Sequence, residues 1–418
     1  MKRNVLLLAA ALLLTSCGTD IETASVTKAV TTAETTTSTT TTAAPQTTSS
    51  APESSVPAAE EKEQKLEIKY EKDLEVHSDV RLSEIVTETN AKLLEPDMQI
   101  DTSELGEKTV TAKLSLNGVS TETDLTVNVI DTTAPVLLTG DYITVAQGSA
   151  YDLSGFGAYA DNCDPYPTLT VNGSVDTSAA GTYNVDVTLS DSSGNSDTRT
   201  VTVEVVGQVS SFIQPENGTM TFADYRAKYG DNVGIDVSAW QGSIDFQSVA
   251  SEGCRFVMVR AGRCTGGLYT DDYFLTNVDN ASAAGLDCGV YFYSSDNDPD
   301  EVREHARWVV NSLNGRQLSM PIAFDWEDFG NFRSYGMSLH DLNDLYLAFK
   351  EEVESAGYSA MLYGSKNFLK SAWETSGENV WLAHYVDNTD YTGQYSLWQT
   401  GICRISGIDA DVDLNVRF

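Results

Sequence analysis

The sequence has little positive charge and few metal-binding side chains. Lys and Arg total 26 against 61 Asp and Glu, which gives a formal net charge of -35. Such a surface repels phosphate backbones, so we expect no nucleic-acid partner. The chain has six cysteines, no Cys-x-x-Cys pair and only four histidines. Because neither residue type clusters with the spacing of a zinc site, we expect no metal and no other cofactor.

Long apolar runs are absent after the first 17 residues. The stretch MKRNVLLLAAALLLTSCG starts basic and has an apolar core of about ten residues, too short to span a bilayer. Its Leu14-Thr15-Ser16-Cys17 resembles the bacterial lipobox, whose cysteine is lipidated and becomes the mature N-terminus. That resemblance implies a lipid-anchored protein on the extracellular face of a bacterial cell membrane. An ordinary secretory signal with a chance cysteine is the alternative.

Large apolar side chains are almost missing from residues 18–65, which are rich in Thr, Ser and Pro. Such a segment cannot bury enough surface to offset the entropy lost on ordering, so we predict a disordered linker. Fully extended, its roughly 48 residues would reach about 150 Å at ~3.1 Å each, which is far enough to enter a cell wall.

Residues 66–206 contain an internal repeat, in which 106–131 aligns with 180–206. Both segments alternate apolar and polar residues between Gly, Asn and Ser turns, a pattern typical of antiparallel strands with one buried face. We predict two small β-sandwich domains, 66–131 and 132–206. The second resembles the immunoglobulin-like repeats of bacterial surface proteins, which implies a spacer or a weak binding module.

The pattern of apolar residues changes after a predicted connector, 207–229. Residues 230–418 contain eight short apolar runs. The gaps after the first five runs hold predicted helices, whereas the last two gaps are too short for a parallel crossover. We therefore predict a modified (β/α)5β3 barrel, in which five βα units precede three strands without helices. A multidomain protein results, with an α/β barrel at its C-terminal end.

Acidic residues stand at the carboxyl ends of the predicted barrel strands, where barrels place their working residues. Asp236 ends the apolar start of the first run, and Asp325 and Glu327 end the fourth in MPIAFDWED. Residues i and i+2 of a strand share a face about 6.6 Å apart, so both acids face inward and Trp326 faces outward. Repulsion would raise one pKa and leave a proton donor beside an anion. A surface Asp-x-Glu that merely ends a strand is the alternative.

Aromatic and amide side chains accompany these acids at the strand ends. Sugar rings stack on aromatic faces and hydrogen-bond at their edges, so the combination predicts a carbohydrate-binding groove. Core packing is the alternative for each aromatic residue. The candidates are Gln241, Tyr291, Tyr293, Tyr363, Trp381, Tyr385, Trp398 and Gln399.

Six motifs in 230–418 resemble glycoside hydrolase family 25, the muramidase-type lysozymes: GIDVSAWQGSIDF, GVYFYS, IAFDWED, WLAHY, LWQ and DVDLNVRF. The resemblance implies a flattened barrel that cleaves the β-1,4 bond between N-acetylmuramic acid and N-acetylglucosamine in peptidoglycan. Two positions depart from the family pattern, which has Lys where this chain has Arg260 and Glu-Gly near Thr265. Loss of that carboxylate affects substrate contacts rather than the acid pair.

The resemblance assigns roles to four acids. Glu327 would be the general acid that later activates water, and Asp325 would hold the substrate's acetamido group as it attacks the anomeric carbon. Asp236 and Asp413 would tune charge and bind sugar, although a rival assignment makes one of them a base or nucleophile. We expect a monomeric peptidoglycan hydrolase; the alternative is a non-catalytic wall-binding or adhesion protein.

Two cysteines stand at the starts of neighbouring predicted strands, Cys254 and Cys288. Strand spacing and an oxidising compartment permit a disulfide, and two buried free thiols are the alternative. We assign no partner to Cys163, Cys264 or Cys403.

The lipobox resemblance predicts that Cys17→Ala abolishes acyl labelling and releases the protein from membranes, because the diacyl anchor is what provides stable attachment. Metabolic labelling with a fatty-acid analogue, followed by membrane fractionation, measures both effects. A mature N-terminus at any residue other than Cys17 would contradict the prediction.

Overall fold

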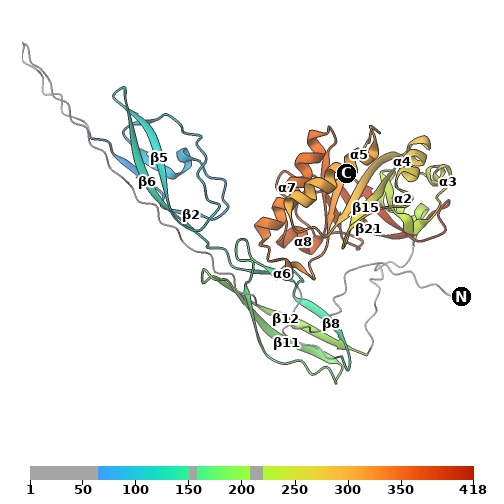
Figure 1. Ribbon diagram of the computed structural model, residues 1–418. Helices are drawn as coiled ribbons and strands as arrows, with labels where there is room; N and C mark the ends of the chain where they lie inside the picture. Colours follow the sequence, from blue (N-terminus) through green and yellow to red (C-terminus); the bar gives the residue numbers. More distant parts are fainter. Residues whose placement is uncertain (1–64, 150–157, 208–219) are drawn as a thin grey trace, which may run out of the picture.

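A computed structural model of the chain describes residues 65–149, 158–207 and 220–418. These residues form two small β domains and a larger α/β domain (Figure 1). The predicted signal and all but the last residue of the predicted linker lie outside the described residues, and so does Cys17. None of the helices in the described part of the chain is long and apolar enough to cross a membrane.

The first β domain is built on the long hairpin of β5 (Gly106–Leu116) and β6 (Val119–Ile130). Asn117 and Gly118 join the strands with positive φ, the backbone that a two-residue hairpin loop requires. The sheet order is β2-β6-β5-β4, and β1 pairs with β3 beside it. The remaining elements are β1 (Ile68–Tyr70), β2 (Asp73–Glu75), α1 (Leu82–Ile85), β3 (Val86–Thr89) and β4 (Lys92–Leu93).

The second β domain repeats the hairpin with β11 (Gly181–Ser190) and β12 (Ser196–Val206), in the other half of the predicted repeat. Alternate residues of both strands, such as Val187 and Val203, are buried in one core. The sheet order is β10-β11-β12-β8, and β7 pairs with β9. The other strands are β7 (Val136–Leu137), β8 (Tyr142–Ala146), β9 (Tyr159–Ala160) and β10 (Thr168–Asn172).

In the C-terminal domain eight strands close into a ring in the order β14-β15-β17-β18-β19-β20-β21-β22. All neighbours are parallel except β22, which lies antiparallel between β21 and β14. The strands of the ring are β14 (Val233–Val237), β15 (Phe256–Cys264), β17 (Asp287–Ser294), β18 (Ile322–Trp326), β19 (Ala360–Ser365), β20 (Val380–Ala383), β21 (Leu397–Arg404) and β22 (Val412–Arg417). Two short strands lie outside it, β13 (Met220–Thr221) and β16 (Leu268–Thr270).

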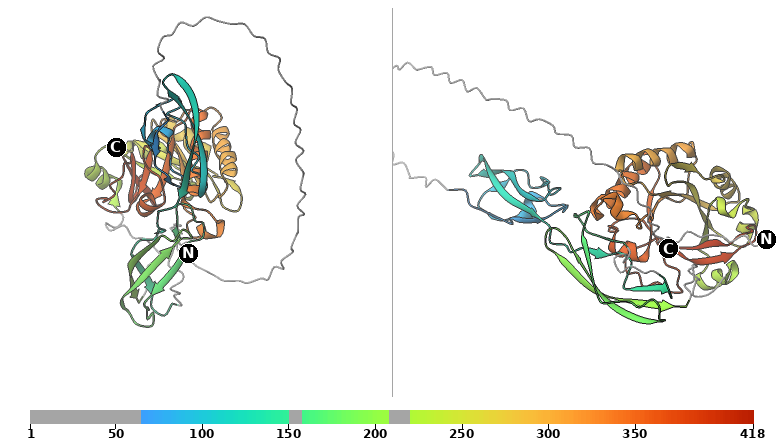
Figure 2. Two further views of the ribbon diagram at one scale, coloured as in Figure 1. Left: turned by 90° about the vertical axis from the view of Figure 1, so that its left-hand side faces the viewer. Right: turned by 60° about the horizontal axis from the view of Figure 1, so that its bottom comes forward.

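Helices follow each of the first five strands of the ring and cover its outside (Figure 2), whereas β20, β21 and β22 follow one another without helices. The helices are α2 (Phe222–Tyr229), α3 (Phe246–Ser251), α4 (Phe274–Ala283), α5 (Pro299–Leu313), α6 (Phe332–Tyr335), α7 (Leu339–Ser355) and α8 (Lys366–Ser371), with a 3-10 turn, η2, at Ala239–Gln241. Ser338 and Asp341 form the reciprocal N-terminal cap that starts α7.

The ring separates two apolar cores, because successive residues of each strand face opposite sides. Phe256, Met258 and Trp381 belong to the inner cluster. Val257, Phe324 and Trp326 belong to the outer cluster beneath the helices. Trp326 therefore points outward, as predicted, and the residues on either side of it in the sequence point inward.

The predicted connector, 207–229, is wrong over its last part. Residues 222–229 form α2, and β13 pairs in parallel with β21. Phe222 and Tyr225 are buried in the outer core of the ring. These residues belong to the C-terminal domain because their apolar side chains complete its packing.

The second β domain packs directly against the C-terminal domain. Leu138 and Ala160 are part of the outer core cluster of the ring. The guanidinium of Arg333 on α6 lies over the ring of Tyr159 at 4.8 Å. The backbone N–H of Leu339, at the start of α7, donates to the carbonyl of Asp161 at 2.7 Å. The contact joins the two domains through shared apolar burial as well as hydrogen bonds.

The cysteines of the described residues are all free thiols. The thiol of Cys254 donates to the carbonyl of Phe256, and that of Cys288 donates weakly to the carbonyl of Gly289. The structure therefore has the two buried thiols of the second alternative, and no disulfide between them.

The closeness of β14 and β15 predicts that Gly234→Ala destabilises the C-terminal domain. A Cβ there would lie 2.4 Å from the backbone oxygen of Phe256, which cannot move without breaking the sheet. We expect a loss of about 1–3 kcal/mol or more, measured by urea unfolding. Gly364→Ala is the matched control, because its Cβ would meet side chains rather than backbone, Leu369 at 3.2 Å and the indole nitrogen of Trp373 at 3.5 Å. Equal unfolding midpoints for the two variants would contradict this reading.

Candidate active site

Strand register places three of the predicted side chains in one row across the ring and pairs two more at its closing seam. Tyr293 on β17 is paired with Asp325 on β18, and Asp325 is paired with Tyr363 on β19. On the closing seam of the ring, Asp236 is paired with Asp413. Because paired residues of neighbouring strands point to the same face, these side chains converge inside the ring near the carboxyl ends of its parallel strands.

Asp325 is buried inside the ring with only 7% of its surface exposed. Its Oδ1 has no hydrogen-bond partner among the described residues. Burial raises the pKa of Asp325 well above its usual value, the charges of Glu327 and Asp236 raise it further, and Arg260 opposes them. An unpartnered carboxylate oxygen in this position is costly unless a substrate group binds to it.

Glu327 follows β18 and is half-buried. Burial raises the pKa of Glu327 to about 7. The spacing of the two acids predicts repulsion as the cause of a raised pKa. Repulsion does contribute at Asp325, but burial is the larger cause there and the cause at Glu327. A carboxyl group that is partly protonated near neutral pH can act as a proton donor.

Asp236 is held by two amides from the strands that close the ring. Its Oδ2 accepts from Gln399 Nε2 at 2.9 Å and from Asn415 Nδ2 at 2.8 Å. Burial raises the pKa of Asp236, while the two hydrogen bonds act in the opposite direction. The side chain is thus fixed in orientation at the seam between β21, β22 and β14.

The same amides extend the network across the ring. The carbonyl oxygen of Gln399 accepts from the hydroxyls of Tyr363 at 2.9 Å and Tyr385 at 2.8 Å. Tyr385 also lies 3.3 Å from Asp413, to which its hydroxyl donates. Burial raises the pKa of Asp413 well above its usual value, and the charge of Asp236 adds to the effect. Two tyrosines and one glutamine therefore connect the acids of the closing seam to β19.

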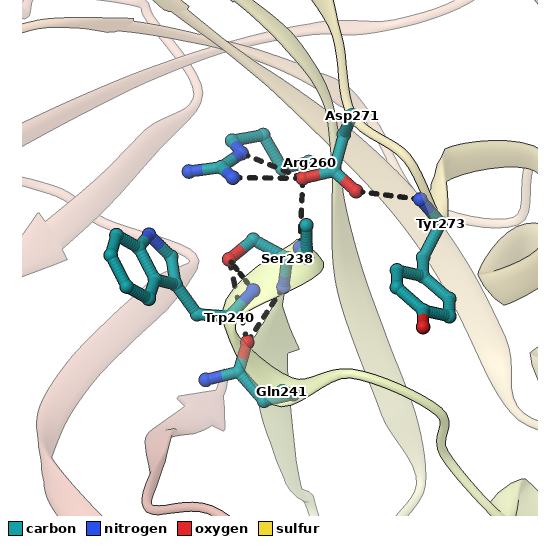
Figure 3. A network of polar contacts seen from close by, with 7 residues as sticks. Ser238, Trp240, Gln241, Arg260, Asp271 and Tyr273 are labelled. Atoms are coloured by element: carbon teal, nitrogen blue, oxygen red, sulfur yellow. Dashed lines mark hydrogen bonds and ion pairs between the residues drawn. The ribbon is translucent and has the colours of Figure 1, made fainter. Parts of the chain in front are cut away.

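One cation, Arg260, lies among these acids, and it is already paired. Its Nε and a terminal guanidinium nitrogen both lie 2.9 Å from Oδ2 of Asp271. Asp271 also accepts from the backbone N–H groups of Ala239 and Tyr273, at 2.8 and 3.0 Å. Figure 3 shows it between Arg260 and Tyr273. Arg260 keeps the positive charge that the family pattern has at this position, and Asp271 holds it in place.

Five of the eight predicted sugar-contacting residues lie beside the acids inside the ring. Tyr291, Tyr293, Tyr363, Tyr385 and Gln399 lie on the interior side with the acids, as their strand positions and contacts show.

Trp398 and Trp381 are corrections to that prediction. Trp398 is buried in the outer core, next to Tyr229 and facing away from the acids, because it neighbours the inward Gln399 on one strand. Trp381 does face inward but is only 1% exposed and packs beneath Tyr363, with its indole N–H bound to Asn415. Neither ring is available for stacking on a sugar.

Gln241 lies at the mouth with its amide already engaged. Its Oε1 accepts from the backbone N–H of Ser238 at 2.8 Å, and its Nε2 donates to the carbonyl of Asp411 at 3.1 Å. Figure 3 shows this cap of the η2 turn beside Trp240, whose ring is 61% exposed. Contact between Gln241 and a sugar remains a prediction.

Residues 235–406 match the family described as "Glycosyl hydrolases family 25". The C-terminal domain belongs to this family. Residues 136–205 match the bacterial surface protein Ig-like domain.

Two relatives named as lysozymes match the family 25 domain. The autolytic lysozyme of Clostridium acetobutylicum is 29% identical over 187 residues, and lysozyme M1 of Streptomyces globisporus is 27% identical over 200 residues. Each match covers 44% of this chain but only 54% and 66%, respectively, of those relatives. A solved bacterial lysozyme from Streptomyces coelicolor is 24% identical, with a TM-score of 0.35 over 44% of this chain and 91% of that one.

Two buried residues of the family 25 site were missed by the sequence argument, Asn415 and Asp271. Asn415 stands two residues after Asp413 in the last strand, so the alternation rule that paired Asp325 with Glu327 could have found it. Asp271 follows the short strand β16, and no periodicity points from there to Arg260. Its role depends on how the loop after β15 folds back over the ring.

The raised pKa predicts that Glu327→Gln stabilises the family 25 domain at alkaline pH. A folded-state pKa near 7 exceeds the unfolded value of 4.5, so the stability is greatest below about pH 4.5 and is lost as pH rises through 7. Glutamine does not ionise, so the variant should gain on the order of 1–3 kcal/mol at pH 8 and almost nothing at pH 4.

Urea unfolding followed by tryptophan fluorescence measures this gain, because all six tryptophans lie between 240 and 398 and report on this domain alone. Glu354→Gln, an exposed position on α7, is the control and should show no pH-dependent difference. A variant less stable than wild type at pH 8 would contradict the assigned pKa shift.

Proposed function

We propose that this protein is a cell-surface peptidoglycan hydrolase that cleaves the β-1,4 bond between N-acetylmuramic acid and N-acetylglucosamine. Support comes from the family 25 match and from relatives named as lysozymes. The site adds four acids gathered inside one ring, beside tyrosine hydroxyls and amides that can hydrogen-bond to sugar.

The observation that carries the proposal is the unpartnered Oδ1 of Asp325. A buried oxygen without a donor in the protein can accept from the N–H of a substrate acetamido group. That hydrogen bond would orient the acetamido oxygen toward the anomeric carbon and stabilise the positive charge that develops on the group as it attacks.

Glu327 would supply the proton in the first step. Its carboxyl proton passes to the glycosidic oxygen while the acetamido oxygen bonds to the anomeric carbon, and the C–O bond to the leaving sugar breaks. The Glu327 carboxylate then takes a proton from the water that attacks the anomeric carbon, which reopens the acetamido ring. The cycle returns Glu327 to its protonated form.

Asp236 and Asp413 would bind sugar and set the potential of the site. Asp236 is buried and Asp413 is half-buried, and burial raises the pKa of both carboxyl groups. Gln399 and Asn415 fix Asp236 in one orientation, which suits a binding residue or positioning residue. The rival assignment, one of these two as base or nucleophile, is tested below.

The proposal extends to the remaining architecture. We propose that the eight-stranded ring is the (β/α)5β3 barrel of the family and that the chain acts as a monomer. A lipid anchor at Cys17 would hold it on the extracellular face of the cell membrane. The linker 18–65 and the domains 66–131 and 132–206 would place residues 230–418 in the wall, where glycan strands are the partner.

The proposal predicts that Glu327→Gln lowers turnover by roughly 10²–10⁴, because the variant keeps the shape of the side chain and loses its proton. Asp325→Asn should lower turnover comparably, because the acetamido group loses its anionic partner. Release of reducing ends from purified peptidoglycan by the full chain measures both, with Glu354→Gln as the control that keeps wild-type activity. Either site variant with near wild-type turnover would overturn the assignment and make Asp236 or Asp413 the leading candidate.

Chemically de-N-acetylated glycan separates the enzyme from a glycan-binding protein. If the acetamido group is the nucleophile, such chains resist cleavage but still compete for binding to the site. Mass spectrometry of the digest identifies the reducing sugar as N-acetylmuramic acid if the bond assignment is right. Saturable binding of intact peptidoglycan without any cleavage would support the non-catalytic alternative.

A further inference from the structure

Three parts of the molecule meet around the segment Asp161–Cys163 of the Ig-like domain. The backbone carbonyls of Asp161 and Asn162 accept from the N–H groups of Leu339 and His340, the first residues of α7. The imidazole of His340 in turn stacks on His77 of the first β domain, with ring centroids 3.7 Å apart. This short segment therefore contacts the family 25 domain, which in turn contacts the first β domain.

Side-chain oxygens crowd together on the other side of the same segment. Asp131, which ends the first β domain, is 8% exposed, and Asp161 is 1% exposed. Single ligand atoms of Asp131, Asp161 and Cys163 all lie within 4.8 Å of one another. The side-chain amide of Asn162 lies 3.1 and 3.2 Å from the two oxygens of Asp161 and 3.3 Å from Oδ1 of Asp131.

The protein does not fully satisfy this cluster. Asp131 Oδ1 accepts from the N–H of Thr133, and Asp161 Oδ2 accepts from the N–H groups of Cys163 and Asp164. Asp131 Oδ2 is buried without any hydrogen-bond partner among the described residues. The amide of Asn162 can turn its nitrogen to the carboxylates, but those contacts reach Oδ1 and not Oδ2 of Asp131.

Positive charge is also missing here. The basic groups close to the cluster are engaged elsewhere in the described part of the chain: the imidazole of His77 stacks on His340, and the guanidinium of Arg333 lies over Tyr159. No ion pair of the described residues includes Asp131 or Asp161. Two buried carboxylates side by side without a cation are costly, so the arrangement calls for a positively charged ligand.

We propose that Asp131, Asp161 and Asn162 bind a hard divalent cation, for which Ca²⁺ is the best fit, at the junction of the three domains. With its oxygen turned inward, Asn162 completes a set of carboxylate and amide oxygens, which are ligands that Ca²⁺ prefers, and water fills the remaining positions. Oxygens 3.1–3.3 Å apart are also spaced to share one ion at 2.3–2.6 Å from each.

The ion would link the first β domain to the Ig-like domain. It would tie the end of the first β domain, through Asp131, to the segment whose carbonyls hold the start of α7. Side-chain binding by Asp161 and Asn162 fixes the direction of those carbonyls. Binding would therefore restrict rotation of the first β domain relative to the Ig-like and family 25 domains, which already share a core.

Isothermal titration of the full chain with CaCl₂, after treatment with a chelator, tests the site. We expect one saturable site, with a dissociation constant at or below roughly 1 mM, in the range of extracellular Ca²⁺ modules. Asp131→Asn and Asn162→Ala should each weaken binding at least about tenfold. Asp186→Asn is the matched control, an exposed aspartate on β11 of the same domain, and should bind as wild type does.

Small-angle scattering of the same samples tests whether the ion links the domains. Ca²⁺ should make the wild-type particle more compact and narrow its distance distribution, and should leave both site variants unchanged. Far-ultraviolet circular dichroism and urea unfolding of the variants show whether they fold as wild type does, so a loss of binding is distinguished from a loss of structure without reference to the proposed activity.

Three outcomes would overturn the proposal. The first is no saturable Ca²⁺ binding by wild type, and the second is binding that both site variants retain. The third is binding of Zn²⁺ but not Ca²⁺ that Cys163→Ser abolishes, which would assign the cluster to a thiolate site instead. The proposal does not depend on the reaction of Glu327, so it can fail or stand independently of the proposed activity.

Discussion

Closure of the strand ring at Asp236 is the constraint on which the site depends. The carboxylate lies where the antiparallel strand β22 inserts between β14 and β21, and the two amides that bind it come from β21 and β22. If β21 or β22 paired in another register, its amide would no longer reach the buried carboxylate, which would lose a hydrogen bond. These hydrogen bonds therefore specify how the ring closes as well as the orientation of Asp236. The tyrosines bound to Gln399 carry the same register to β19.

Burial, more than repulsion between neighbours, sets the electrostatics of the site. Four acids share the interior with one arginine whose charge Asp271 largely neutralises. Burial therefore raises the pKa of each of these acids, and it raises the pKa of Glu327 to about 7. This suits a reaction that begins with proton donation. It also costs stability, which the large apolar cores on both sides of the ring must offset.

The sequence is informative where the alternation of residues along a strand decides which face of the sheet a side chain occupies. The inward pair Asp325 and Glu327 and the outward Trp326 followed from spacing alone. Trp398 was placed wrongly although the same rule forbids it from facing inward beside Gln399. Asp271 and the paired state of Arg260 could not be predicted, because the loop that brings them together has no period. The contact of the Ig-like domain with α7 was equally hidden, since it joins residues about 180 apart in the sequence.

The shared core between the Ig-like domain and the ring has a consequence for how such proteins can be assembled during evolution. Domains joined only by a linker can be exchanged freely, because neither one supplies side chains to the core of the other. Here Leu138 and Ala160 fill part of the outer core, and two backbone carbonyls cap the start of α7. Replacing the Ig-like domain by an unrelated spacer would leave apolar surface and helix N–H groups uncovered. The two domains therefore form one heritable unit.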